Sequence, residues 1–520
     1  MSEENTSLLD SGHAPHRPAP LSVLQEQIWF FSQLAPDNPV YNEMFAVHHD
    51  GEDLDIAALR SAFNEFVRRH QILRSTFAEL DSVPMQTVHP PPTWELPLLD
   101  LSAMPRAEAE QAAARLRVDD ARRPYDLSTG PLIRPELVRI AADHHRLYLG
   151  LHHIVFDGVS LNRVLLPELE ALYDDAAAGR APSLPEPAIQ YADFARHSGD
   201  GVGERELDER VAYWRRRLDG APTLELPIDR RRPARQTFHG RMEQLPNLSR
   251  PLVERLRALS HDHGASLFQA LAAAFAILLQ RCTGQDDVVF GTIADLRQRY
   301  YVGLESMAGY CVTPLVLRAD LHGEPSFLDV LQRIRTDLRG GLEHLLPFEV
   351  LVRELRPHRE AGVNPLFQAM MVMQPARASG DSRWSVHHMD AAFATAVGTS
   401  KFDLSIDLDE ESDGVIYGRL GYNPDIFETG TAQRLAGRWG RLLESIAGAP
   451  TAPITELAIV SEEAEQQQLA EWNHTDVDHP LDACLHELIA AQARRTPEAA
   501  VSDGRTRLSF AELDDRAGRL

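Results

Sequence analysis

The sequence predicts a mixed α/β (α+β) protein, because segments with helical periodicity alternate with short apolar segments along most of the chain. Its 520 residues are enough for roughly two to four domains. Hydrophobic residues make up 43% of the chain and charged residues 25%. These fractions are ordinary for a globular protein, so collagen-like and wholly disordered classes are excluded.

The chain is expected to become ordered about twenty residues from its start. Residues 1–19 contain prolines and few apolar side chains, which is typical of a flexible lead-in. Ser22 and Gln25 have the spacing of a capping box, so a helix should begin just after Ser22. The apolar face of this helix is predicted to hold Leu24, Ile28, Phe31 and Leu34.

A second amphipathic helix is predicted over residues 56–70. Its inward face would carry Leu59, Phe63, Phe66 and Val67. Further on, residues 144–153 have strand character, and after a short loop residues 161–176 have helical character again. This passage from strand to loop to helix contains the residues with the strongest chemical signal.

A proline-rich break at residues 181–187 separates the first third of the chain from the rest. Beyond it, Ser266 and Gln269 repeat the capping-box spacing and open an apolar helix that should run to about Arg281. Residues 287–291 follow as a predicted buried strand. Helices and strands therefore continue to alternate beyond the break.

The end of the chain has a different character. Prolines at residues 449–453 and an acidic, glutamine-rich run at residues 461–468 indicate an exit from the folded body. The remaining residues, 481–520, are near the lower size limit for an independent core. They are expected either to pack on the main body or to be part of a larger domain.

Charge and cysteine content restrict the class of function. The chain has 52 Lys and Arg against 77 Asp and Glu, a formal charge of −25, which argues against a nucleic-acid-binding protein. The longest apolar stretch, residues 267–279, is shorter than a membrane span, and the polar start does not resemble a secretory signal. Three widely spaced cysteines indicate reduced thiols, with no disulfide framework and no metal site. We therefore expect a cytoplasmic protein without membrane or nucleic-acid partners.

The chemical signal lies in His152, His153, Asp157 and Gly158, between the predicted strand and helix. Neighbouring side chains on an extended segment point to opposite faces, so only one of the two histidines can enter a given cleft. His153 is nearer the loop and is the better candidate to accept or relay a proton. Asp157 could orient an imidazole, cap the helix or pair with an arginine, and Gly158 allows close approach to the backbone. The local pattern equally fits a buried histidine pair with an aspartate helix cap.

The motif His152-His153-x-x-x-Asp157-Gly158-x-Ser160 resembles the signature of condensation domains of nonribosomal peptide synthetases. Other segments are similar to that family in the same order along roughly residues 20–465. They are Leu21-Ser-Val-Leu-Gln25-Glu-Gln27-Ile-Trp29-Phe, Arg69-His70-Gln-Ile-Leu73-Arg74-Ser-Thr76-Phe77, Tyr191-Ala-Asp193-Phe194-Ala, Phe290-Gly-Thr-Ile-Ala-Asp-Leu-Arg297, Pro347-Phe-Glu349-x-Leu-Val352 and Asn364-Pro-Leu-Phe-Gln368.

The resemblance implies two lobes, each like chloramphenicol acetyltransferase, arranged as a V-shaped pseudo-dimer around a central tunnel. It implies amide bond formation between a donor acyl or peptidyl thioester and an acceptor aminoacyl thioester. Both thioesters would be on phosphopantetheine arms of an upstream donor and a downstream acceptor carrier protein, and the chain itself would bind no cofactor. An adenylation domain of the same module would be a further partner.

Individual site residues follow from the same resemblance. His153 and Gly158 are expected at the reaction centre, with His152, Asp157 and Arg297 as structural residues around it. Substrate contacts are expected from Val159, Ser160, His344 and Ser400. The chain departs from the family pattern at Val159, where tryptophan is common, and at Ile293 and Leu296, which replace a proline and an asparagine.

The tail has its own resemblance. Leu485-His-Glu-Leu488, Arg495-Thr-Pro-Glu498 and Leu508-Ser-Phe-Ala-Glu-Leu513 are similar to the start of an adenylation domain. The expected organisation is a lead-in (1–19), an N-terminal lobe (20–180), a C-terminal lobe (181–465), a linker (466–480) and an adenylation-domain fragment (481–520). The alternatives are an epimerisation or dehydrating variant of the same fold and a non-catalytic recruitment platform.

Overall fold

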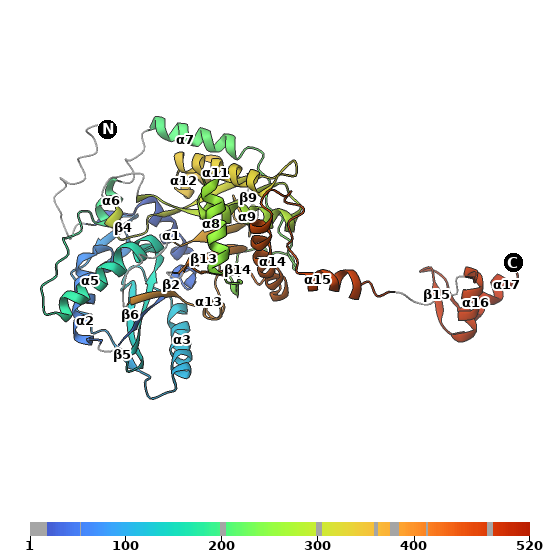
Figure 1. Ribbon diagram of the computed structural model, residues 1–520, viewed down its shortest axis with the longest axis horizontal. Helices are drawn as coiled ribbons and strands as arrows, with labels where there is room; N and C mark the ends of the chain where they lie inside the picture. The colour runs from blue at the N-terminus through green and yellow to red at the C-terminus, as the bar shows by residue number, and fades with distance from the viewer. Residues whose placement is uncertain are drawn as a thin grey trace. The chain divides into compact units, whose positions relative to one another are not determined.

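The computed structural model describes residues 18–51, 54–197, 204–297, 304–357, 362–374, 384–411, 414–475 and 482–520. These residues form two compact units, which divide between Ile459 and Val460. The first unit contains two large sheets with helices packed beside them (Figure 1). The mixed α/β class predicted from the sequence is confirmed.

The first large sheet is built mainly from the N-terminal third of the chain. In spatial order its strands are β12 (Trp384–His388), β2 (Asn42–Asp50), β7 (His144–His152), β6 (Ile133–Ala141) and β5 (Leu98–Asp100). The helices of this half are α1 (Val23–Leu34), α2 (Ile56–Arg69), α3 (Arg106–Arg122) and α5 (Leu166–Ala177). A small sheet of β1 (Ala19–Pro20), β4 (Val83–Val88) and β3 (Ser75–Leu80) lies beside them.

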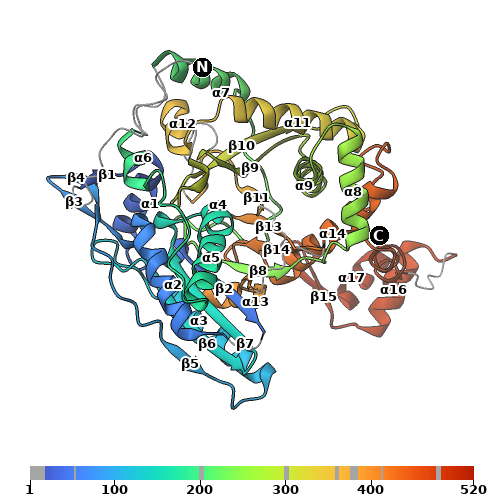
Figure 2. The same cartoon turned by 60° about the vertical axis from the view of Figure 1, so that its left-hand side comes forward.

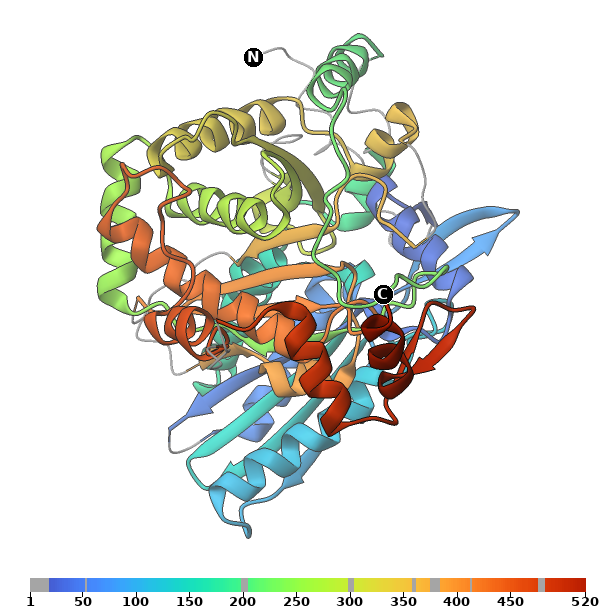
Figure 3. The same ribbon diagram turned by 90° about the vertical axis from the view of Figure 1, so that its right-hand side faces the viewer.

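The second large sheet is mixed, with a parallel centre and antiparallel edges. In spatial order its strands are β10 (Val312–Asp320), β9 (Asp287–Asp295), β11 (Ala369–Met373), β13 (Leu404–Glu410), β14 (Ile416–Tyr422) and β8 (Arg241–Gln244). Beside it lie α8 (Arg250–Asp262), α9 (Leu267–Thr283), α11 (Phe327–Glu343) and α14 (Thr429–Gly448), as Figures 2 and 3 show. The shorter helices are α6 (Tyr191–His197), α7 (Glu204–Arg217), α12 (Phe348–Leu355) and α13 (Ala391–Val397).

One strand crosses from the second half of the chain into the first sheet. β12 pairs antiparallel with β2, in a register that runs from Trp384 opposite His49 to His388 opposite Phe45. The sequence-based division into residues 20–180 and 181–465 therefore does not separate the two sheets, because residues 384–388 complete the sheet of the first lobe.

The predicted helices agree closely with the structure. The capping box of Ser22 and Gln25 is present, and the predicted inward residues of α2 are buried. The predicted face of α1 is partly wrong, because Leu34 in the last turn is 71% exposed. The predicted lead-in is also one residue too long, because Ala19 pairs with Gln86 in the small sheet and is buried. Residues 1–17 lie outside the described residues.

The predicted helix over residues 161–176 is more complex than the sequence suggests. A helical turn begins at Gly158 (α4, Gly158–Ser160), a π-helical turn follows over Leu161–Leu165, and α5 continues to Ala177. The apolar helix α9 is buried along almost its whole length, as the sequence predicts. In the part of the chain that is described, no single helix is long and apolar enough to span a membrane. The pair α8 and α9 passes that test only jointly, with a 101° bend.

The second unit begins at Val460 with the short helix α15 (Glu462–Gln466). After it come α16 (Leu485–Arg495), a hairpin of β15 (Ala500–Ser502) and β16 (Arg507–Ser509), and α17 (Phe510–Gly518). Among the described residues of this unit, only Ala493 is buried. The unit therefore has almost no core of its own.

Candidate active site

The His152–Ser160 segment connects β7 to the helical region that ends in α5. His152 is the last residue of β7, and its ring lies between Tyr41 and Tyr125, at centroid distances of 6.3 and 5.8 Å. Its Nδ1 accepts the N–H of Ile154 at 3.3 Å, which turns the chain into a 3₁₀ turn. Burial lowers the pKa of His152 to about 3, with smaller contributions from the neighbouring His153 and from the Lys401 ammonium. His152 is therefore a neutral residue of the scaffold.

His153 points the other way and reaches a cavity, with 18% of its side chain exposed. Its ring stacks on Phe156 at 5.2 Å and meets the edge of Tyr310 at 5.1 Å. Nδ1 lies 2.9 Å from the Phe156 carbonyl oxygen, which can only accept a hydrogen bond. Nδ1 must therefore carry the proton, and Nε2 of the neutral ring is left as an acceptor.

The charge state of His153 depends on burial and on four nearby groups. Burial and the Lys401 ammonium lower its pKa, whereas the Glu43 carboxylate, the Phe156 carbonyl and Asp157 oppose that shift. Glu43 Oε1 lies 4.0 Å from Nε2. With the pKa below its usual value, the imidazole is neutral at physiological pH and can take a proton at Nε2.

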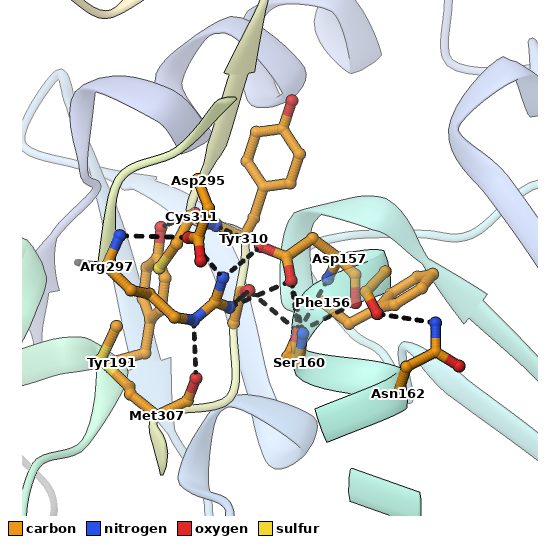
Figure 4. Close-up of polar contacts among 12 residues, drawn as sticks. Phe156, Asp157, Ser160, Asn162, Tyr191, Asp295, Arg297, Met307, Tyr310 and Cys311 are labelled. Carbon is orange, nitrogen blue, oxygen red and sulfur yellow. Dashed lines mark hydrogen bonds and ion pairs between the residues drawn. The ribbon is translucent and has the colours of Figure 1, made fainter. Parts of the chain in front are cut away.

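Asp157 and Arg297 form a buried ion pair behind the histidine loop (Figure 4). Both carboxylate oxygens accept from the guanidinium at 3.0 Å, and both side chains are at most 1% exposed. Asp157 also accepts the N–H of Ser160 and of Cys311, each at 2.7 Å. Burial alone would raise the pKa of Asp157, but Arg297 and these N–H donors outweigh it and hold the pKa below its ordinary value.

Residues distant in sequence fix the same loop. The Gln25 side-chain amide donates to the Ile154 carbonyl at 3.2 Å. The Tyr191 hydroxyl donates to the Tyr310 carbonyl at 2.6 Å and lies 2.7 Å from the Ser22 hydroxyl. Tyr191 also packs against Gly309, whose φ is +147° and where a Cβ would lie only 1.9 Å from the tyrosine ring. With Arg297, residues from three of the segments that carry the resemblance thus hold the loop of His153.

A cavity of about 940 Å³ lies beside His153 and is lined from both halves of the first unit. The first half contributes β2, α1 and the histidine loop, and the second contributes β9, β13, β14 and the segment before β13. Among the predicted site residues, His153, Gly158, Val159 and Ser400 line it. Ile293, one of the departures from the family pattern, also faces the cavity, whereas Leu296 is buried outside it.

Two predicted substrate contacts are not on this cavity. Ser160 is fully buried, and its hydroxyl bonds to Asp157 and lies 3.2 Å from the Gly309 carbonyl. The helical turn that begins at Gly158 rotates Ser160 inward, so it serves as a structural residue. His344 ends α11, stacks on Tyr213 at 4.1 Å and bonds through Nδ1 to the Gly340 carbonyl. Neither residue supports the predicted role in substrate binding.

Glu43 and Gln374 are cavity residues that the sequence motifs do not indicate. Glu43 lies on β2, and Lys401 Nζ is 3.5 Å from its Oε1 and 4.8 Å from the centre of the Tyr41 ring. Gln374 covers Gly158 so closely that a Cβ there would lie 2.4 Å from its Oε1. An acidic residue next to the otherwise apolar stretch 44–47 is the one sequence signal that could have revealed Glu43.

Metal and disulfide chemistry have no visible basis within the described residues. No group of three or more His, Cys, Asp or Glu side chains is arranged to hold a metal ion there. All three cysteines are free thiols, and burial raises the pKa of Cys311 well above its ordinary value.

Comparisons with known proteins agree with this geometry. Residues 16–469 match the family model of the condensation domain. The chain is 38% identical over 505 residues to a linear gramicidin synthase of Brevibacillus parabrevis, covering 96% of this chain but only 6% of that protein. It is 35% identical over 520 residues to a chondramide synthase of Chondromyces crocatus, covering 98% of this chain and 13% of that protein. The chain thus spans only a small part of the length of these relatives.

Solved structures with the same fold include the X-domain from teicoplanin biosynthesis, at 28% identity and a TM-score of 0.72 over 87% of this chain and all of that one. The first condensation domain of the calcium-dependent antibiotic synthetase has a TM-score of 0.72 over 86% of this chain and all of that one, and at 24% identity it supports the fold alone. Because the family model covers most of the chain and a curated relative is 38% identical along 96% of it, the chain belongs to the condensation-domain family of nonribosomal peptide synthetases.

Proposed function

We propose that this chain forms an amide bond between a donor acyl or peptidyl thioester and an acceptor aminoacyl thioester, each attached to the phosphopantetheine arm of a carrier protein. The observation that carries the proposal is His153, whose unprotonated Nε2 faces a cavity lined from both halves of the first unit. Membership of the family supports it, because condensation domains catalyse peptide bond formation.

The chemistry asks little of the protein, because a thioester is already reactive. The acceptor amine attacks the donor carbonyl carbon, the C–N bond forms, and the C–S bond breaks as the tetrahedral intermediate collapses. Nε2 of His153 holds the attacking nitrogen, takes the proton that this nitrogen loses late in the step, and returns it to the departing thiolate. Most of the acceleration comes from holding two tethered reactants in line.

Gly158 has a second role in this scheme. As the first residue of a helical turn, it presents a backbone N–H that belongs to the unbonded donors of a helix start. That N–H would stabilise the oxyanion of the tetrahedral intermediate. Val159 and Ser400, on the same cavity, would contact the reactants.

The partners of the domain follow from the same proposal. A donor and an acceptor carrier protein would bring the phosphopantetheine arms, so the chain would need no cofactor of its own. Residues 481–520 would be the start of an adenylation domain, which fits a unit with almost no core. The cytoplasm remains the predicted location, from the reduced cysteines.

A recruitment role is the second candidate. The X-domain of teicoplanin biosynthesis, which has the same fold, forms a complex with OxyB in a solved structure. A recruitment domain would form no amide and its imidazole would be dispensable, so the two candidates differ in whether the natural protein makes the amide.

The experiment loads two carriers with defined thioesters and measures the amide product by mass spectrometry. The natural protein is compared with His153→Ala, and His344→Ala serves as a matched control because His344 lies off the cavity. We expect product only from the natural protein and the control. Equal yield from His153→Ala would remove the assigned role of His153. No product from the natural protein, with carriers still bound, would overturn the proposal in favour of recruitment.

A further inference from the structure

The charged residues nearest His153 come from two distant parts of the chain. Glu43 lies on β2, next to the strand that leads to His153, and Lys401 lies just before β13. Their side chains meet at 3.5 Å and both line the cavity. Lys401 also lies over the Tyr41 ring, which holds its ammonium beside the carboxylate.

The Glu43 carboxylate lies between this ammonium and the imidazole. Its Oε1 is 3.5 Å from Lys401 Nζ and 4.0 Å from His153 Nε2. The second distance is too long for a hydrogen bond, and a neutral imidazole with its proton on Nδ1 has no N–H to offer there. Both atoms are therefore acceptors that face each other across a gap.

One nitrogen fits that gap. Two N–H···acceptor bonds of about 2.9 Å each together span about 5.8 Å, more than the 4.0 Å between Oε1 and Nε2, so a single nitrogen can bond to both atoms. A primary ammonium has three N–H donors, enough for Glu43, His153 and one more acceptor. The acceptor aminoacyl group brings such a nitrogen, and it must lose a proton before it attacks.

We propose that Glu43 binds the α-ammonium of the acceptor aminoacyl group and holds its nitrogen against Nε2 of His153. This proposal rests on the function proposed above. The ammonium loses one proton to solvent, and the amine formed keeps its hydrogen bond to Glu43 as it attacks the thioester carbon. Nε2 then takes the second proton, which the nitrogen loses as the amide forms. Glu43 then faces the imidazolium, whose charge it stabilises until the proton passes to the departing thiolate.

Lys401 sets how strongly Glu43 can bind a second cation. Other charged or titratable groups around the pair are Asp407 on β13, Asp157 behind the loop, and Tyr310, whose ring contacts the imidazole. Glu43 raises the pKa of His153 and Lys401 lowers it. Glu43→Gln and Lys401→Met should therefore move the acid limb of the pH–rate profile in opposite directions, to lower and to higher pH.

The decisive experiment varies the acceptor. One acceptor has a normal α-amine, and the other has an aminooxy group in its place, which is uncharged near neutral pH. For Glu43→Gln we expect the KM of the amine acceptor to rise roughly 10- to 100-fold, as for loss of a hydrogen bond to a charged group, with a change of less than about threefold for the aminooxy acceptor. Glu110→Gln is the matched control, since Glu110 is similarly exposed and paired with Arg146 outside the cavity.

The outcomes separate the two proposals. Equal effects of Glu43→Gln on both acceptors, or no effect on either, would overturn the role of Glu43 while leaving amide formation intact. If Glu43→Gln fails to fold, as shown by circular dichroism, Glu43→Asp decides with the same two acceptors: equal effects on both would equally overturn the role of Glu43. Absence of amide from the natural protein with both acceptors would instead refute the proposed function.

Discussion

Replacing Asp157 should lower the stability of the domain as well as its rate of amide formation. Asp157→Ala removes a carboxylate that accepts from both terminal nitrogens of Arg297 and from the backbone of Ser160 and Cys311. Breaking one side of a buried ion pair costs roughly 3–5 kcal/mol. Arg297 keeps Asp295 at 3.0 Å and two backbone carbonyls, while two buried N–H donors lose their acceptor. We therefore expect a loss of about 4 kcal/mol in the free energy of unfolding.

Urea unfolding followed by tryptophan fluorescence measures this loss, and the amide assay is run on the same samples. Asp295→Ala is the matched control: Asp295 also pairs with Arg297 but is 21% exposed, so its loss should cost no more than about 1 kcal/mol. The double variant Asp157→Ala with Arg297→Met should recover part of the stability, because no unpaired buried charge remains. If Asp157→Ala unfolds at the same urea concentration as the natural protein yet makes no amide, the structural reading of Asp157 is wrong and a direct role in catalysis is favoured.

Three further predictions concern pH and packing. Burial lowers the pKa of His152 to about 3, so below about pH 6.5 the unfolded chain takes up a proton that the folded chain does not. The free energy of unfolding should therefore fall by about 1.4 kcal/mol per pH unit as the pH is lowered. His152→Asn should flatten that slope in urea titrations, and an unchanged slope would refute the prediction. Burial raises the pKa of Glu349 to about 7, and one of its carboxylate oxygens has no hydrogen-bond partner. Above about pH 4.5 this carboxyl is therefore ionised in the unfolded chain but still protonated in the folded one. The free energy of unfolding should fall as the pH rises from 4.5 towards 7. Glu349→Gln should therefore stabilise the domain by up to about 3 kcal/mol at pH 8 and hardly at pH 4.5, and equal effects at both would contradict this. The methyl group added by Gly158→Ala should displace the Gln374 side chain and reduce the rate of amide formation about tenfold. The double variant Gly158→Ala with Gln374→Ala should restore the rate. If it does not, the added methyl group acts on something other than Gln374.

Local signals in the sequence predict much of this structure. The capping boxes at Ser22 and Ser266 give the helix starts correctly because the cap and its partner are only three residues apart. Alternation along the extended strand gives the opposite directions of His152 and His153. The ion pair of Asp157 with Arg297 comes from the family resemblance, since its partners lie 140 residues apart and no local pattern joins them.

The sequence does not predict features that depend on the exact rotation of a helix or on contacts between residues far apart in the chain. Ser160 follows the motif directly, but the turn of helix that begins at Gly158 points it inward. Leu34 continues the apolar periodicity of α1 past the surface that the helix covers. Glu43 and Lys401 meet across 358 residues, which no spacing in the sequence reveals.

The crossing strand β12 has a consequence for protein engineering. Chimaeric synthetases that take one half of a condensation domain from each parent, with a junction near residue 180, would join a sheet to a strand of foreign origin. Because β12 supplies the neighbour of β2, such a hybrid would keep native backbone pairing at that edge only if residues 384–388 came from the same parent as β2. A fragment that ends at the proline-rich break would leave that edge open and prone to self-association. Recombination points should therefore be chosen so that the two interlocked pieces are inherited together.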